Sequence, residues 1–135
     1  MKKQIFINLP VSDLKKSMAF YEAFGFTNNP QFTDDTAACM VLSEEIFVML
    51  LTHPKFSQFT VKQIADTQKT VAVINAFSVE SNEAVNTYAD KAIAAGAKET
   101  KEPQDYGFMY LRSFSDIDGH HWEVFFMDMS KFPKQ

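Results

Sequence analysis

A histidine and a glutamate near the end of the chain are the side chains best suited to chemistry. His121 and Glu123 lie two positions apart in the apolar run 121–127, which is typical of a β-strand. Alternate residues of a strand point to the same face, so His121, Glu123 and Phe125 share one face. Such a pair can act as general acid and base. An ordinary hydrogen-bonded histidine beside a carboxylate with a structural partner fits the pattern as well.

A second pair of polar side chains lies in the preceding apolar run. Tyr110 and Arg112 alternate within the predicted strand 108–114 and therefore share a face. The guanidinium of an arginine is a planar fork of donors that suits an anionic or polar ligand. On the outer face of a sheet, the same residues would form a cross-strand salt bridge, with Glu123 as one candidate partner. Alternation alone does not decide between the two.

The other reactive side chains are predicted to be inert. Cys39 lies in mid-strand with no basic neighbour in sequence, which predicts a buried thiol rather than a nucleophile. As the single cysteine, it also excludes an internal disulfide, which fits a reducing cytoplasm. His120 follows a glycine turn and is predicted to be exposed, and His53 is predicted to lie at the surface.

The composition is that of one globular domain in the cytoplasm. The chain has 135 residues, of which 46% are hydrophobic, enough for a sizeable core. The net charge is −4 and the basic residues are scattered, which argues against a nucleic-acid partner. No apolar run approaches the roughly 20 residues that span a bilayer, and the N-terminal run is too short for a signal peptide. We therefore expect neither a membrane nor a nucleic acid as a partner.

The elements that position these residues form two similar halves of one domain, 1–135. Each half, about 1–66 and 67–135, has the pattern of a strand, a helix and three further strands. The segment FINLPV at 6–11 parallels INAFSV at 74–79, as expected of a duplicated unit. The predicted strands are 4–9, 31–33, 37–43, 46–52, 70–79, 98–101, 108–114 and 121–127, with a hairpin turn at 116–119.

The two helices have recognisable ends. Ser12 or Asp13 can accept the free N–H groups of the first helix, and Ser81 can do so for the second. Gly25 and Gly96 stand where a C-terminal glycine would end each helix. The strand–helix–strand pattern therefore predicts an α+β fold.

Three motifs carry a resemblance to a known family. The segment VSDL at 11–14, with Phe-Tyr at 20–21 and Gly-Phe at 25–26, resembles the first helix of the glyoxalase/bleomycin-resistance/dioxygenase (vicinal oxygen chelate) superfamily. The segment DIDGHHWE at 116–123 resembles its closing hairpin, and PQDYG at 103–107 the loop before it. The resemblance covers nearly the whole chain. It implies two βαβββ units that form a curled mixed sheet around a cavity.

The resemblance also implies where a metal would bind. Enzymes of the family hold a divalent metal through four inward-facing positions, which correspond here to Phe6, Met49, Ile74 and Glu123. Only Glu123 offers a donor to a hard divalent metal, because a methionine sulfur is too soft. A shift of register by two would bring Asn8 into the cavity instead. We therefore expect no metal site and no cofactor.

These residues favour a small-molecule binding protein of the superfamily, without the usual metal site. The alternative is a lyase or isomerase of lactoylglutathione lyase (glyoxalase I) type, which would use Glu123 and a divalent metal, so the sequence leaves enzymatic activity open. Glu123 and His121 are the candidate catalytic residues. Sheet edges left by one pair of units favour a homodimer. The candidate ligand-binding residues are Phe6, Asn8, Met49, Ile74, Tyr110, Arg112 and Phe125.

Overall fold

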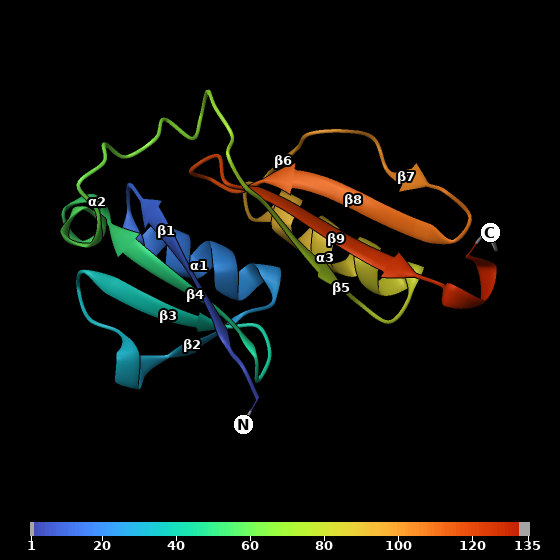
Figure 1. Ribbon diagram of the computed structural model, residues 1–135, viewed down its shortest axis with the longest axis horizontal. Helices are drawn as coiled ribbons and strands as arrows, with labels where there is room; N and C mark the ends of the chain where they lie inside the picture. The colour runs from blue at the N-terminus through green and yellow to red at the C-terminus, as the bar shows by residue number, and fades with distance from the viewer. Residues whose placement is uncertain (1, 133–135) are drawn as a thin grey trace. The chain divides into compact units, whose positions relative to one another are not determined.

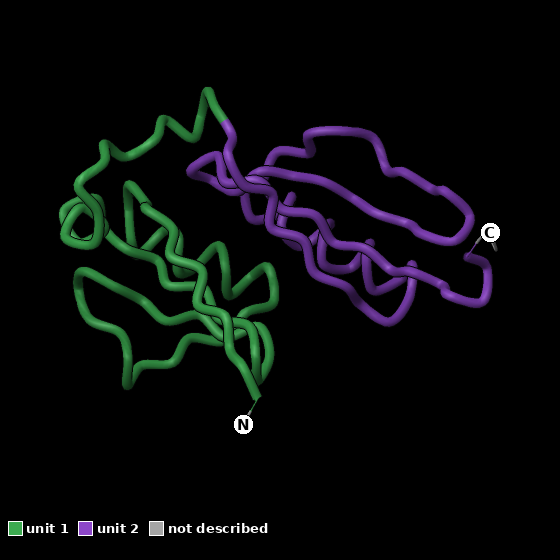
Figure 2. Tube along the Cα trace, in the orientation of Figure 1, with its two compact units in different colours: residues 1–70 green, residues 71–135 purple. Residues whose placement is uncertain are grey.

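The computed structural model describes residues 2–132, which form two compact units divided between Thr70 and Val71 (Figure 2). Each unit consists of one sheet with one long helix on one of its faces (Figure 1). The units repeat the same order of a strand, a helix and further strands. This confirms the α+β fold and the duplication that the sequence predicts.

The first unit has a four-stranded sheet in the order β1-β4-β3-β2. Strand β1 runs parallel to β4, and the other neighbours are antiparallel. Three short helical turns, η1, α2 and η2, follow β2 and β4. The elements are β1 (Ile5–Val11), α1 (Leu14–Phe24), β2 (Thr27–Asn29), η1 (Pro30–Phe32), β3 (Ala37–Val41), β4 (Ile46–Thr52), α2 (His53–Phe56) and η2 (Ser57–Phe59).

The second unit repeats this topology in the order β5-β9-β8-β6. Its first strand, β5, is parallel to its last, β9, and β8 is antiparallel to β9 and to both short strands β6 and β7. The elements are β5 (Ile74–Ser78), α3 (Asn82–Ala94), β6 (Lys98–Glu99), β7 (Gln104–Asp105), β8 (Met109–Ser115), β9 (His121–Met127) and the 3-10 turn η3 (Met129–Lys131).

Side-chain caps begin both long helices. The carboxylate of Asp13 accepts the N–H of Lys16 at 3.1 Å, and the hydroxyl of Ser81 accepts the N–H of Ala84 at 3.0 Å. These bonds satisfy backbone donors that have no partner within the helix. Gly25 ends α1 at φ 127°, a conformation that residues with a side chain rarely adopt. Of the two predicted first caps, Asp13 is therefore the one used.

The hairpin turn between β8 and β9 is organised by one buried carboxylate. Asp116 Oδ1 accepts the N–H of Asp118 at 2.9 Å and that of His120 at 2.8 Å. Gly119 supplies the positive φ, 90°, that the turn needs. The prediction that His120 is exposed is wrong: it is buried, because its N–H and carbonyl both bond to Asp116 and draw it into the turn.

Several predicted boundaries are corrected. Residues 31–33 are not a strand, because Pro30 has no N–H to donate and Asn29 accepts the N–H of Gln31, which starts the turn η1. The strand of this region is β2, which begins four residues earlier, at Thr27. The two-residue strand β7 and the helical turns α2 and η2 were not expected, and β5 starts at Ile74 rather than at residue 70.

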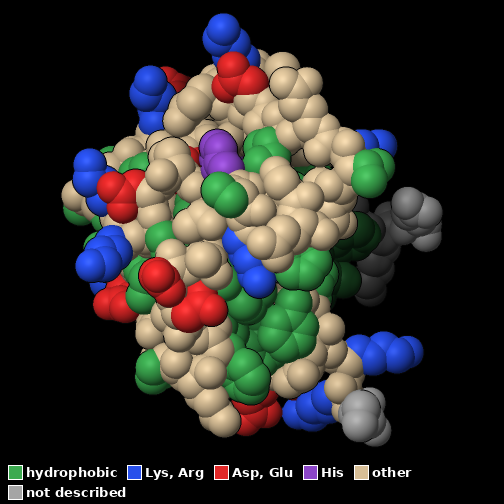
Figure 3. Space-filling model, turned by 90° about the vertical axis from the view of Figure 1, so that its left-hand side faces the viewer, with side chains coloured by type: hydrophobic (Ala, Val, Ile, Leu, Met, Phe, Trp, Pro, Cys, Tyr) green, Lys and Arg blue, Asp and Glu red, His purple; other side chains and the backbone are tan. Residues whose placement is uncertain are grey.

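Two observations bear on the expectation that the protein binds neither a membrane nor a nucleic acid. No helix among residues 2–132 has both the length and the apolar character that crossing a membrane requires. On the face drawn in Figure 3, the described Lys and Arg side chains lie among acidic ones and form no continuous basic stripe.

Candidate functional site

Each sheet has a face opposite its helix, which we call its open face. In the second sheet, Arg112 bonds to Asn86 and Asp90 of α3, which identifies the helix face. Val124 is opposite Arg112 and therefore shares that face, and Glu123 points the other way. The open face carries Ile74, Ala76 and Ser78 of β5, Met109, Leu111, Ser113 and Ser115 of β8, and His121, Glu123, Phe125 and Met127 of β9.

Glu123 lies at the centre of this face with a neutral partner. Its neighbours across the sheet are Ser113 on β8 and Ala76 on β5. The buried hydroxyl of Ser113 donates to Glu123 Oε2 at 3.3 Å. Among residues 2–132, no basic side chain forms an ion pair with Glu123. The carboxylate therefore keeps most of its capacity to accept hydrogen bonds from a ligand.

His121 and Phe125 flank Glu123 along β9, as alternation predicts. Both are half-buried on the open face, and His121 lies opposite Ser115 and Ile74. Within the described part of the chain, no hydrogen bond joins His121 to Glu123. The two side chains are neighbours on one face, but they are not an assembled acid–base pair.

The open face of the first sheet is mostly apolar. Phe6 stacks on Phe47, with ring centroids 4.5 Å apart and planes 11° from parallel. Asn8 lies opposite Met49, and its amide donates to the carbonyl of Phe6 at 3.3 Å. Phe6, Asn8 and Met49 thus share a face, so a register shift by two would not have moved them to the other side. Strands β1, β3 and β4 supply Phe6, Asn8, Pro10, Ala37, Cys39, Val41, Phe47, Met49 and Leu51 to it.

The four positions expected to hold a metal do not fit one. Phe6 and Met49 lie on the open face of the first sheet, and Ile74 and Glu123 on that of the second. Phenylalanine and isoleucine offer no lone pair, and a thioether is a poor ligand for a hard divalent ion. Residues 2–132 contain no cluster of three His, Cys, Asp or Glu side chains placed to share a metal.

Cys39 on β3 has the properties of a structural thiol. It is buried, and burial raises the pKa of its thiol, which keeps it protonated at neutral pH. A protonated thiol is neither a good nucleophile nor a metal ligand.

Tyr110 and Arg112 do not join Glu123, because they lie on the helix face. The buried guanidinium of Arg112 donates through Nη1 to Asp90 Oδ1 at 2.7 Å and through Nε to Glu99 Oε2 at 3.1 Å. Burial opposes its charge, but the hydrogen bonds and charges of Asp90 and Glu99 outweigh it and raise the pKa of Arg112. Arg112 therefore stays charged, and its fork serves an internal ion-pair network rather than an open ligand site.

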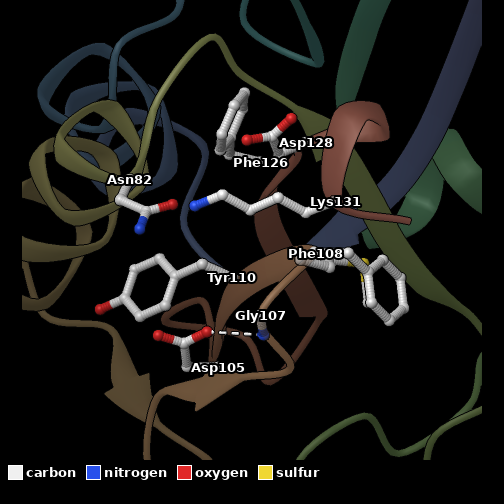
Figure 4. A pocket seen from close by; sticks show the side chains of 9 residues that line it. Asn82, Asp105, Gly107, Phe108, Tyr110, Phe126, Asp128 and Lys131 are labelled. Carbon is white, nitrogen blue, oxygen red and sulfur yellow. Dashed lines mark hydrogen bonds between the residues drawn. The ribbon is translucent and has the colours of Figure 1, made fainter. Parts of the chain in front are cut away.

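Tyr110 lines a small cavity on the same side of the sheet (Figure 4). Its hydroxyl donates to Asn86 Oδ1 at 2.8 Å. The cavity, about 40 Å³, lies between the start of α3 and the end of β9, and the side chain of Lys131 extends across it toward Asn82. This volume holds about one or two water molecules, far below the roughly 300 Å³ of a typical ligand pocket. Sequence reasoning missed Lys131 because it follows the last strand and belongs to no periodic pattern.

Comparisons with known proteins agree with this architecture. The model of the Glyoxalase/Bleomycin resistance protein/Dioxygenase superfamily matches residues 3–124. The "hypothetical protein SA1046 from S. aureus" is 29% identical, with a TM-score of 0.77 over 93% of this chain and 95% of that one. No curated protein matches this sequence.

Two more distant structures share the fold alone. A glyoxalase/bleomycin resistance protein/dioxygenase family enzyme from Burkholderia phytofirmans PsJN is 20% identical, with a TM-score of 0.77 over 93% of this chain and 99% of that one. The fosfomycin resistance protein FosX from Listeria monocytogenes is 18% identical, with a TM-score of 0.68 over 97% of this chain and 98% of that one.

Proposed function

Because the chain belongs to the glyoxalase/bleomycin resistance protein/dioxygenase superfamily, we propose that it binds a small molecule on the open face of its second sheet, without a metal. One observation carries this proposal. Of the four positions that hold a metal in enzymes of the family, only Glu123 has a suitable donor, and its carboxylate has a serine rather than a cation as its partner. A carboxylate placed in this way can accept hydrogen bonds from an organic ligand directly.

The surroundings of Glu123 support a ligand rather than a metal. Leu111 lies opposite Phe125 on the same face, and Met127 follows along β9. Apolar side chains around a few polar groups are the usual composition of a small-molecule site. In this arrangement the half-buried side chains of Phe125 and Met127 bind the apolar part of the ligand, and Glu123 fixes its orientation. His121 is a second polar group within reach on the same strand.

A lyase or isomerase of glyoxalase I type is the competing function, and the retained Glu123 is the observation in its favour. Such an activity depends on a bound divalent metal, for which the side chains Phe6, Met49 and Ile74 provide no ligand. We expect no isomerisation of the hemithioacetal of methylglyoxal and glutathione after addition of Ni²⁺ or Zn²⁺. Turnover that requires the metal and is lost in Glu123→Gln would favour the enzyme instead.

The binding function is tested by the molecules that co-purify with the protein. We expect mass spectrometry of an extract to find a small molecule with the wild-type protein and not with Glu123→Gln. Glu102→Gln, which changes the net charge equally but lies in an exposed loop, should retain it. The stability of Glu123→Gln should change by less than about 1 kcal/mol, as expected for a residue outside the core. A less stable variant that keeps its ligand would show that Glu123 has only a structural role.

We also propose that the protein is a homodimer with two-fold symmetry. Strands β1 and β5 are each at an edge of their own sheet, and Ile5, Phe6 and Ile74 on them are exposed. Exposed strand edges with apolar side chains are usually covered in native proteins. Light scattering at micromolar concentration should give twice the mass of the chain, and the mass of one chain would contradict the proposal.

A further inference from the structure

We propose that the open face of the second sheet selects a flat, positively charged organic molecule over a neutral or anionic one of the same shape. This inference rests on the proposed function and specifies the chemical class of its ligand. It follows from the charges on that face, from the side chains that flank Glu123, and from the position of the only arginine.

The central strands of this face carry one carboxylate and no permanent cation. Neither β5, β8 nor β9 places a Lys or Arg on it. The nearest Lys or Arg in register is Lys98, on the edge strand β6. It is exposed and lies opposite Ser115, in the row of His121 rather than that of Glu123. Arg112, the only arginine of the chain, is held by Asp90 and Glu99 on the other face. An anionic ligand would therefore meet Glu123 without a cation to offset the repulsion.

The donor beside Glu123 is also unavailable to an anion. The hydroxyl proton of Ser113 is already donated to Glu123 Oε2. A serine hydroxyl has only one proton to donate, so an anion at this point would have to break that bond. A ligand that brings its own donor and a positive charge needs no such change, because the carboxylate can accept it directly.

Small side chains leave the carboxylate accessible. Ala76 and Ser113 lie on either side of Glu123 across the sheet, and neither reaches as far from the sheet as a glutamate. Phe125 is the next residue along β9 on the same face, opposite Leu111. A cation over an aromatic ring is attracted to it. A flat cation can therefore lie against the half-buried ring of Phe125 with its charged group directed to Glu123.

Three acridines of similar size and different charge test this selectivity. They are 9-aminoacridine, which is a cation at pH 7.5, acridine, which is neutral, and acridine-9-carboxylate. Each is titrated into the full-length protein and followed by fluorescence and by calorimetry. We expect the cation to bind about tenfold more tightly than acridine, as one charge-assisted hydrogen bond would give, and the carboxylate to bind most weakly.

Three variants separate the charge of Glu123 from other effects. Glu123→Gln should make the affinities for 9-aminoacridine and acridine equal within about twofold, with acridine still bound. Ser113→Ala keeps the carboxylate and should keep the preference for the cation. Glu102→Gln should also keep it, which excludes an effect of net charge alone. Thermal melting shows that each variant is folded.

The outcomes distinguish this inference from the proposed function. If acridine-9-carboxylate binds as tightly as 9-aminoacridine, or if Glu123→Gln keeps the preference, the charge selectivity is wrong while the binding site stands. If none of the three probes binds, both the selectivity and the proposed site are wrong.

Discussion

The two halves of this protein have the same topology and different interiors. In the first unit, the space between α1 and its sheet is filled by aromatic rings: Phe20, Tyr21, Phe24 and Phe26 are buried and contact one another. In the second unit, the buried residues of the helix α3 are smaller, Val85, Ala89 and Ala92, and the large buried rings, Phe114 and Trp122, come from the sheet. Arg112 forms ion pairs with Asp90 of α3 and Glu99 of β6 on the helix face.

The open faces of the two sheets differ in their ionisable side chains. The strands β1, β3 and β4 place no ionisable group except the buried Cys39 on the open face of the first sheet. That of the second carries His121 and Glu123. Two copies of a duplicated unit can therefore share a topology while one open face is mostly apolar and the other carries ionisable groups. The fold alone does not determine which copy carries the site.

The largest expected effect concerns the aromatic core of the first unit. Replacing Phe24 by Ala removes a fully buried ring from contact with Phe20, Tyr21 and Phe26. The loss of buried area and the cavity left behind should lower the free energy of unfolding by about 3–5 kcal/mol. Urea denaturation measures this, with Phe59→Ala as the control because Phe59 is 71% exposed. Equal losses in the two variants would contradict the assignment of the core.

A smaller loss of stability is expected at the ion pairs. Each unit has one basic side chain that lies beside two carboxylates. Arg112 has a side chain 10% exposed and bonds to Asp90 and Glu99, whereas Lys2, 76% exposed, lies beside Glu44 and Glu45. Arg112→Ala should cost about 2–3 kcal/mol, less than for a fully buried pair because water can reach the two acids. Lys2→Ala should cost less than about 0.5 kcal/mol. Thermal melting measures both losses. If Arg112→Ala loses as little stability as Lys2→Ala, the ion pairs of Arg112 with Asp90 and Glu99 do not stabilise the fold.

The location of the ion-pair network shows what the sequence could not supply. Alternation correctly placed Tyr110 and Arg112 on one face, and His121, Glu123 and Phe125 together on one face. The face of Tyr110 and Arg112 depends on their partners in α3 and β6, Asn86, Asp90 and Glu99, which are 13 to 26 residues away in sequence. No local pattern contains that information.

The fold was more predictable than its short elements. The long strands have apolar residues at regular spacing, and both long helices also have capping residues at their ends. The sequence therefore predicts the boundaries of most of these elements to within a few residues. Strands β2 and β7, of three and two residues, are too short to show alternation. They exist because β3 and β8 offer unpaired backbone groups to them, which is a property of the folded sheet.

The smallest expected effect is on the loss of stability at low pH. It should be similar in the two units. Hydrogen bonds from the backbone and side chain of Thr36 lower the pKa of Asp34, and those from Ser130 lower the pKa of Asp128. A lowered pKa stabilises the fold above the ordinary value of 3.8, and that contribution is lost as the pH falls through the folded-state pKa. Asp34 is exposed and Asp128 only half-buried, so the effect is small. Asp34→Asn and Asp128→Asn should each lose less melting temperature between pH 5 and pH 3 than the wild type does. A larger loss in either variant would contradict the assignment.

The metal content of the purified protein tests the central claim most directly. The protein and its Glu123→Gln variant are equilibrated with Zn²⁺, Ni²⁺ or Mn²⁺, desalted, and measured by mass spectrometry of the metal. Because Phe6, Met49 and Ile74 stand at three of the four expected ligand positions, we predict far less than one ion per chain, with no difference between the two proteins. One tightly held ion per chain in the wild type, lost in Glu123→Gln, would contradict the account.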